Sequence, residues 1–235
     1  MRNLRNLFPL ILCLLLVHLA IPSVCLGDNQ EFGRTHPDLA ARFANIKKIG
    51  LLPPGIRIYA VSAGGVVELR NDWTGQAKEN VARAIRNLLG ERLVELKVPD
   101  EDRKLTEEID DIEGLYSAIV LTIGSSGPYA FPAKDVSAYS LGPLHDICGR
   151  WNVDALLFAY GSDQISSGGR KALAVMIGAV GWEGATSLGI GLVDSEGSLL
   201  WFKGETIHAY YDLRDSDSAA RFAEKTLTGF PGLGK

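Results

Sequence analysis

A continuous apolar run near the middle of the chain constrains the fold more than any other feature. Residues 154–161 read Asp-Ala-Leu-Leu-Phe-Ala-Tyr-Gly, and only the ends of the run are polar. A run without alternation is typical of a central strand that is covered on both faces of its sheet. The chain therefore needs helices to supply that cover, which predicts a two-layer or three-layer α/β sandwich.

Amphipathic segments provide the helices. Apolar residues recur every three or four positions from Thr74 to Leu93, where Asn71, Asp72 and Thr74 offer capping oxygens. The clearest helix places an apolar stripe opposite an acidic face, and Gly124 follows it. Its stripe consists of Leu105, Ile109, Ile112, Leu115, Ile119 and Ile123. Shorter helices are expected around residues 37–45, at residues 144–151 and at residues 217–227.

Segments with the pattern of β-strands lie between the predicted helices in the sequence. Short apolar strands are predicted at residues 48–52, which Pro53 and Pro54 end, and at residues 56–62. Residues 186–193 and 198–203 flank a turn over 194–197 and predict a β-hairpin, and residues 206–211 predict a further strand. One face of the first hairpin strand carries only Ser187, Gly189 and Gly191, so we expect a neighbouring backbone to approach it closely. The fold class is α/β, a single domain with a mixed sheet, flanking helices and a C-terminal β-hairpin.

The N-terminus has the pattern of a secretory signal peptide. Arg2 and Arg5 precede an apolar run over residues 7–21, and small residues follow it. The run is shorter than the roughly 20 residues that span a bilayer. We predict a signal peptide over residues 1–27, a polar N-terminal tether over 28–45, and a single α/β domain over 46–235.

Cys25 has two interpretations. It is an ordinary signal-peptide residue if cleavage follows Gly27, or the lipidation site of a bacterial lipoprotein if cleavage precedes it. Val24 is large for the position before a lipidated cysteine, and Pro22 stands where such sites usually carry leucine. Cys148 is the one cysteine of the predicted mature domain, so no intrachain disulfide is expected there.

Composition excludes several classes of protein. Hydrophobic residues make up 46% of the 235-residue chain and charged residues 22%, which argues against a mainly disordered protein. One apolar stretch approaches the length of a membrane span, which argues against a polytopic membrane protein. The formal net charge of −4 argues against nucleic acid as a partner.

Catalytic, cofactor and metal motifs are weak. Residues 124–127 and 167–171 miss the serine-hydrolase and phosphate-loop patterns, and His36, His145 and His208 lie far apart in sequence. No catalytic residue, cofactor or metal is predicted from these patterns. His145 and Cys148 share a helix face, so a nucleophilic Cys–His pair is one hypothesis. Cys148 as an ordinary core residue is the alternative, and we favour it.

The apolar segment over residues 172–181 also has two interpretations. It is either buried core, or a surface for self-association or membrane contact, because Arg170, Lys171 and Trp182 flank it. The interface candidates are Arg170, Lys171, Val175, Ile177 and Trp182, with Arg70 beside them. Aspartate at Val175 and Ile177 would disrupt assembly in the second case and unfold the domain in the first.

The order of these elements resembles a known group of envelope proteins. The residues that carry the resemblance are Pro53-Pro54, Asn71-Asp72-Trp73, the strand Val153 to Gly161 with Asp154-Ala155-Leu156-Leu157, and Leu200-Trp201-Phe202. Over about residues 45–228 the chain resembles bacterial periplasmic lipoproteins of the curli-secretion-channel type and the N-terminal domain of the translocation protein TolB. The resemblance implies an accessory of a transporter or polysaccharide export machine. The segment 172–181 is too short for two membrane-spanning strands of about 9–11 residues, so no pore is predicted.

These observations favour a non-enzymatic exported envelope protein, a self-associating or partner-binding accessory lipoprotein of an export or transport system. We expect a homo-oligomer or an envelope protein partner, membrane association through lipid at Cys25, and a place in the periplasm or at the outer membrane. A soluble periplasmic ligand-binding protein with a cleft near Ser62 to Gly65 is one alternative. A Cys/His-dependent hydrolase is the other.

Overall fold

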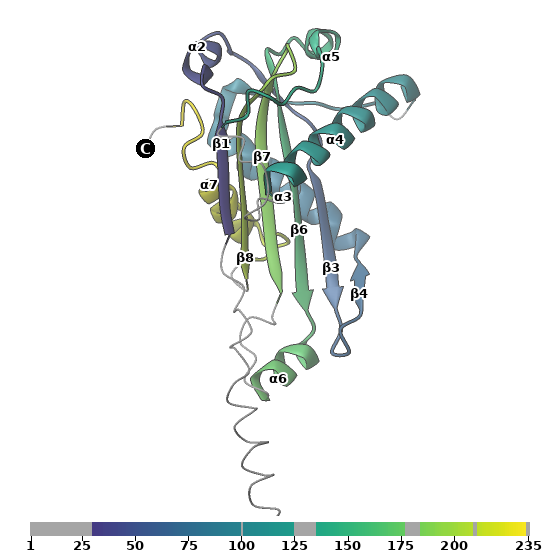
Figure 1. The fold of residues 1–235 in the computed structure, drawn as a ribbon. Helices are drawn as coiled ribbons and strands as arrows, with labels where there is room; N and C mark the ends of the chain where they lie inside the picture. Colours follow the sequence, from purple (N-terminus) through teal and green to yellow (C-terminus); the bar gives the residue numbers. More distant parts are fainter. Residues whose placement is uncertain (1–29, 100, 125–134, 177–183, 209–210, 234–235) are drawn as a thin grey trace, which may run out of the picture.

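Strand β6 (Ala155–Ser166) runs through the centre of the sheet in the computed structural model, as its apolar sequence predicts (Figure 1). The structure describes residues 30–99, 101–124, 135–176, 184–208 and 211–233, and within them the mixed sheet has eight strands. β6 pairs antiparallel with β7 (Ala185–Asp194) along most of its length. It extends five residues beyond the predicted end at Gly161.

Two short strands share the other edge of β6. β2 (Ile49–Leu51) pairs parallel with its first residues, and β3 (Gly55–Val61) pairs parallel with its second half. Pro53 and Pro54 separate them, because proline donates no backbone hydrogen bond to a ladder. β5 (Leu93–Glu95) then joins β2, and β4 (Val67–Leu69) joins β3.

The predicted hairpin is present, but the separate strand over 206–211 is not. β8 (Leu199–His208) pairs antiparallel with β7 and passes through Gly204 without a break. The Phe32 ring fills the space beside this glycine, where a Cβ would lie 2.7 Å from ring atoms. Gly204 therefore allows a close contact within one long strand instead of ending a short one.

Part of the segment expected as a tether forms a strand of the sheet and a short helix. β1 (Gln30–Thr35) pairs antiparallel with β8 as an edge strand, and the predicted short helix follows as α2 (Leu39–Phe43). The polar sequence of β1 lacks the apolar alternation that predicts a strand, because an edge strand buries few side chains. Its Phe32 ring packs against Phe202, and Glu31 pairs with Lys203 at 3.1 Å.

Helices cover both faces of the sheet, which makes three layers (Figure 1). One apolar core lies under α3 (Asn71–Leu89), which the short 3-10 turn η1 (Gly90–Arg92) follows, and under α7 (Ser216–Thr226). The other lies under α4 (Arg103–Gly124) and α5 (His145–Trp151). The predicted α/β class is confirmed. The inward residues expected on the closing helix are all buried, namely Ala219, Phe222, Ala223 and Leu227.

One residue that the sequence predicts for the buried stripe of α4 is exposed in the structure. Leu115 is 44% exposed, whereas its neighbour Tyr116 is 1% exposed and stacks on Phe158 with ring centroids 4.4 Å apart. The Tyr116 ring also lies over Gly191 of β7, where a Cβ would be 2.9 Å from ring atoms. The Phe202 ring lies beside Gly189 in the same way, so aromatic rings, not the expected backbone, lie against these two glycines.

Candidate functional site

Helix α6 (Gly168–Met176) lies beyond the end of β6, and it contains three of the five predicted interface residues. Ala174 is its one buried residue, while Val175 is 78% exposed and Met176 is 81% exposed. For this part of the apolar segment, the interpretation as buried core is therefore wrong. Ile177 and Trp182, the other two candidates, lie outside the described residues.

The first turn of α6 is attached to the neighbouring strand. The backbone N–H of Ser167 donates to the carbonyl of Val61 at 2.8 Å, and the Ser167 hydroxyl accepts from the N–H of Arg170 at 3.3 Å. These bonds hold the start of the helix against β3. The side chains of the last turn then project past the end of the sheet.

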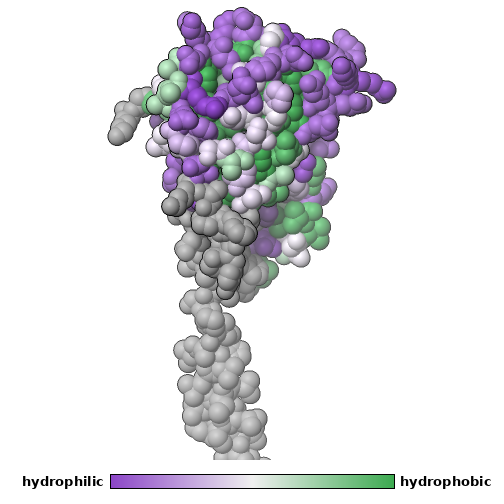
Figure 2. Space-filling view, turned by 45° about the horizontal axis from the view of Figure 1, so that its top comes forward, coloured by the Kyte–Doolittle hydropathy of each residue, from purple (hydrophilic) through white to green (hydrophobic). Residues whose placement is uncertain are grey.

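The turn between β3 and β4, together with β4 itself, extends the apolar area. Val66, Val67 and Leu69 are exposed there. The turn lies beside α6, since a Cβ at Gly65 would be 3.6 Å from Nη1 of Arg170 and one at Gly169 would be 3.4 Å from the Cβ of Ala63. Figure 2 shows apolar residues gathered at this end of the molecule. We call the group the α6 surface, and its residues are Val66, Val67, Leu69, Leu173, Val175 and Met176.

Two cationic side chains belong to the same end. Lys171 is exposed on α6, and Arg170, half-buried, precedes it in the helix. Arg70 is held differently, because its guanidinium makes two hydrogen bonds to Asp72 and lies 4.2 Å from the ring centroid of Trp73. The hydrogen bond from Arg70 lowers the pKa of Asp72. Arg70 thus belongs to an ion pair and a cation–π contact at the edge of the α6 surface.

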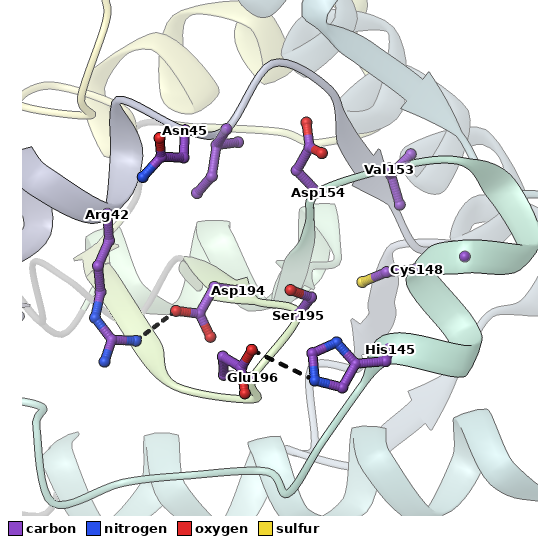
Figure 3. A pocket seen from close by; sticks show the side chains of 11 residues that line it. Arg42, Asn45, His145, Cys148, Val153, Asp154, Asp194, Ser195 and Glu196 are labelled. Atoms are coloured by element: carbon purple, nitrogen blue, oxygen red, sulfur yellow. Dashed lines mark hydrogen bonds and ion pairs between the residues drawn. The ribbon is translucent and has the colours of Figure 1, made fainter.

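A polar pocket of about 560 Å³ lies at the opposite end of the sheet (Figure 3). It brings together α5, the β7–β8 turn, Arg42 of α2 and the segment that follows α2. Arg42 donates to Asp194 at 2.6 Å, and Asp154 accepts hydrogen bonds from the backbone N–H groups of Lys47 and Lys48. Two of the pocket's carboxylates therefore bind groups of the protein itself.

The predicted Cys–His pair lines this pocket, but its geometry does not favour a nucleophile. Cys148 is 2% exposed, and burial raises the pKa of its thiol to about 11, with further contributions from Asp154 and Asp194. His145 Nε2 lies 3.4 Å from Glu196 Oε1. A reactive cysteine needs thiolate at neutral pH, so the core interpretation of Cys148 fits the site better.

Asp163, which the sequence analysis missed, is a buried carboxyl on β6. It is 2% exposed and accepts a hydrogen bond from the backbone N–H of Leu213 at 3.1 Å. Burial raises its pKa to about 6. Thr186 Oγ1 lies 3.0 Å from Asp163 Oδ1 and 2.9 Å from the carbonyl of Tyr211. The Thr186 hydroxyl donates to these two oxygens, and its hydrogen bond to Asp163 lowers the pKa of the carboxyl against the larger effect of burial.

Asp163 also lines a second pocket of about 320 Å³, close to α6, together with Lys171, Asp212 and Arg214. A signal for it was present in the sequence, since an aspartate within a strand that continues an apolar run is unusual. The expected cleft near Ser62 to Gly65 is instead an exposed turn. Its Ser62 hydroxyl accepts a hydrogen bond from the N–H of Val66.

The described residues contain neither a metal-binding cluster nor a membrane-spanning helix. Among them, no cluster of three or more histidine, cysteine or acidic side chains is arranged to bind a metal ion. None of their helices combines the length and the apolar character that a membrane span requires.

Comparisons with known proteins yield a weak structural likeness. No protein-family model matches the chain, and no curated protein matches it. The PelC dodecamer from Paraburkholderia phytofirmans is similar with a TM-score of 0.41 and 14% identity, over 85% of this chain and 95% of that one. A point variant of the same dodecamer also gives 0.41, with 13% identity over 85% and 96%. Likeness at this level carries no inference about assembly or function.

Proposed function

We propose that the protein is a non-enzymatic, exported accessory of the cell envelope that works by binding other components of an export or transport system. The α6 surface is the observation that carries the proposal. Six apolar side chains are exposed together at one end of the domain, although its two cores are well covered. Contiguous exposed apolar residues on a folded domain usually mark a binding surface.

The N-terminal sequence supports the envelope location. The start of the chain has the basic residues and the apolar run of a signal peptide, and cleavage before Cys25 would leave that cysteine as a site for lipid. In the proposed mature form, Cys25 carries the lipid and tethers the domain to a membrane. Association with further copies or with an envelope protein then takes place at that membrane.

The hydrolase alternative has less support from the geometry. Its nucleophile would be a buried thiol whose pKa of about 11 keeps it protonated at neutral pH. The ligand-binding alternative gains one observation, the polar pocket of about 560 Å³. Asp194 and Asp154 of that pocket already accept hydrogen bonds from Arg42 and from backbone N–H groups, so we rank this alternative second.

Fractionation of the native cells followed by mass measurement tests the proposal. We expect the protein in the envelope fraction, with a mass that shows loss of the signal peptide, and a native mass in mild detergent above that of one chain. An intact Met1 in the cytoplasmic fraction would overturn the proposal. A monomer in the soluble periplasm, starting at Asp28, would favour the ligand-binding alternative.

A further inference from the structure

The α6 surface has features that point to one kind of partner. We infer that it binds a lipid bilayer with anionic headgroups, so that this end of the domain rests on the membrane. The inference rests on the proposed function, since it names the partner of the surface that carries that proposal. Three properties of the surface support it, namely its apolar tip, its cationic neighbours and its position relative to the chain start.

The apolar tip is shaped for shallow insertion. Val175 and Met176 are the most exposed residues of α6 and lie in its last turn, at the far end from the sheet. Val66 in the adjacent turn and Val67 at the start of β4 are exposed beside them. Apolar side chains at the tip of a helix and a turn can enter the boundary between headgroups and acyl chains without any change in the sheet.

The charges beside the tip favour anionic lipid. Lys171 and Arg170 occupy the first turn of the same helix, although the whole chain has a net charge of −4. The nearby Glu68 alternates with Val67 and Leu69 along β4 and so points to the other face of the strand. Basic residues next to exposed apolar ones are typical of surfaces that bind anionic membranes.

The start of β1, the first described strand, lies at the same end of the sheet as α6. β1 begins at Gln30, which pairs with Thr206 close to the end of β8, and β6 ends at Ser166 just before α6 (Figure 1). Gln30 lies five positions after Cys25 in the sequence, and five residues of extended chain span at most about 18 Å. A lipid on Cys25 would therefore hold the α6 surface against the bilayer and leave the polar pocket facing away from it.

The size of the surface argues against a second copy as its partner. Stable protein–protein interfaces bury about 800 Å² on each side and use roughly 20–30 residues. The α6 surface offers six large apolar side chains at a tip. Such a tip suits insertion into lipid better than a stable contact between two copies.

Vesicle flotation tests the inference without the lipid anchor. We would use the processed chain with Cys25→Ser, with its N-terminus verified, and vesicles of phosphatidylethanolamine and phosphatidylglycerol against vesicles of phosphatidylcholine. We expect binding to the anionic vesicles that weakens as salt is added. The double variant Val175→Asp, Met176→Asp should bind roughly tenfold more weakly or worse. Lys171→Gln should lose roughly fivefold on anionic vesicles alone.

Leu121→Asp provides a matched control, because Leu121 is 70% exposed on α4 and lies outside the α6 surface. It should bind vesicles as the parent chain does, and all variants should keep the parent melting temperature. Equal vesicle binding by the parent and the double variant would overturn the inference, as would no binding by the parent. An oligomer that the double variant loses, without vesicle binding, would assign the surface to a second copy. That outcome would leave the proposed function standing, since fractionation tests it separately.

Discussion

At the residue scale, burial determines the reactivity of the Cys148 thiol. Its sequence neighbours include His145 at a spacing that suits a catalytic pair, yet its side chain packs in the core under α4 and α5. Loss of hydration disfavours the charged thiolate, which raises the pKa of the thiol to about 11. Sequence spacing could place the two residues on one helix face, but it could not show how deeply the sulfur is buried.

Iodoacetamide labelling checks this account of Cys148. At pH 7.5 we expect the native protein to leave Cys148 unmodified over the time in which the urea-unfolded chain is fully alkylated, as followed by peptide mass spectrometry. The reason is that both access and ionisation are suppressed in the folded state. Rapid labelling of the native protein would contradict the core interpretation of Cys148 and favour the hydrolase alternative.

The raised pKa of Asp163 predicts that the stability of the fold depends on pH. Its folded-state pKa of about 6 lies above the ordinary value of 3.8, mainly because of burial, so the native state holds its proton more tightly than the unfolded chain does. Its contribution to stability is therefore fully present below about pH 4 and is lost as pH rises through about 6. Between pH 4 and 7 the loss from this group is about 2–3 kcal/mol. Asp212 and Arg214 also act on the carboxyl, with opposite signs.

Asp163→Asn removes the titration while keeping an acceptor for the N–H of Leu213. Urea unfolding of both proteins at pH 4.5 and at pH 7 should show that the variant loses less stability than the parent as pH rises. If the free energy of unfolding changes equally between pH 4.5 and pH 7 in the parent and the variant, the assignment of a raised pKa to Asp163 is contradicted.

At the scale of elements, periodicity predicted most helices and the central strands because those elements bury a regular apolar face. α3 begins three residues before the predicted start, and α7 is shifted by one residue. β1 was missed because an edge strand with polar residues lacks that signal. The core interpretation of residues 172–176 failed for a different reason, since apolar composition alone cannot distinguish a buried helix from an exposed one.

The contact between α4 and β7 provides a test of packing. Gly191→Ala should destabilise the domain by about 1–3 kcal/mol, because its Cβ would crowd the buried ring of Tyr116. Gly114→Ala in α4 is the control. A Cβ there meets no atom within 4 Å, so a gain of about 0.5–1 kcal/mol is expected from helix propensity. Chemical denaturation measures both values, and a neutral Gly191→Ala would show that Tyr116 does not pack there.

For the whole molecule, the two ends of the sheet have different characters. The α6 surface, the start of β1 and the second pocket lie at one end, and the larger polar pocket lies at the other. β6 spans the distance between them, about 40 Å for a strand of its length. This polarity follows from chain topology, which single-sequence patterns could not place in space. In our account the apolar end faces the membrane and the polar end faces the periplasm.

The mass of the mature protein purified from its native envelope tests the central claim most directly. The account predicts a chain that begins at Cys25, carries covalently attached acyl chains, and remains in the membrane fraction until detergent is added. A chain that begins at Asp28, carries no lipid and is recovered in the soluble fraction would contradict the membrane-tethered accessory that we propose.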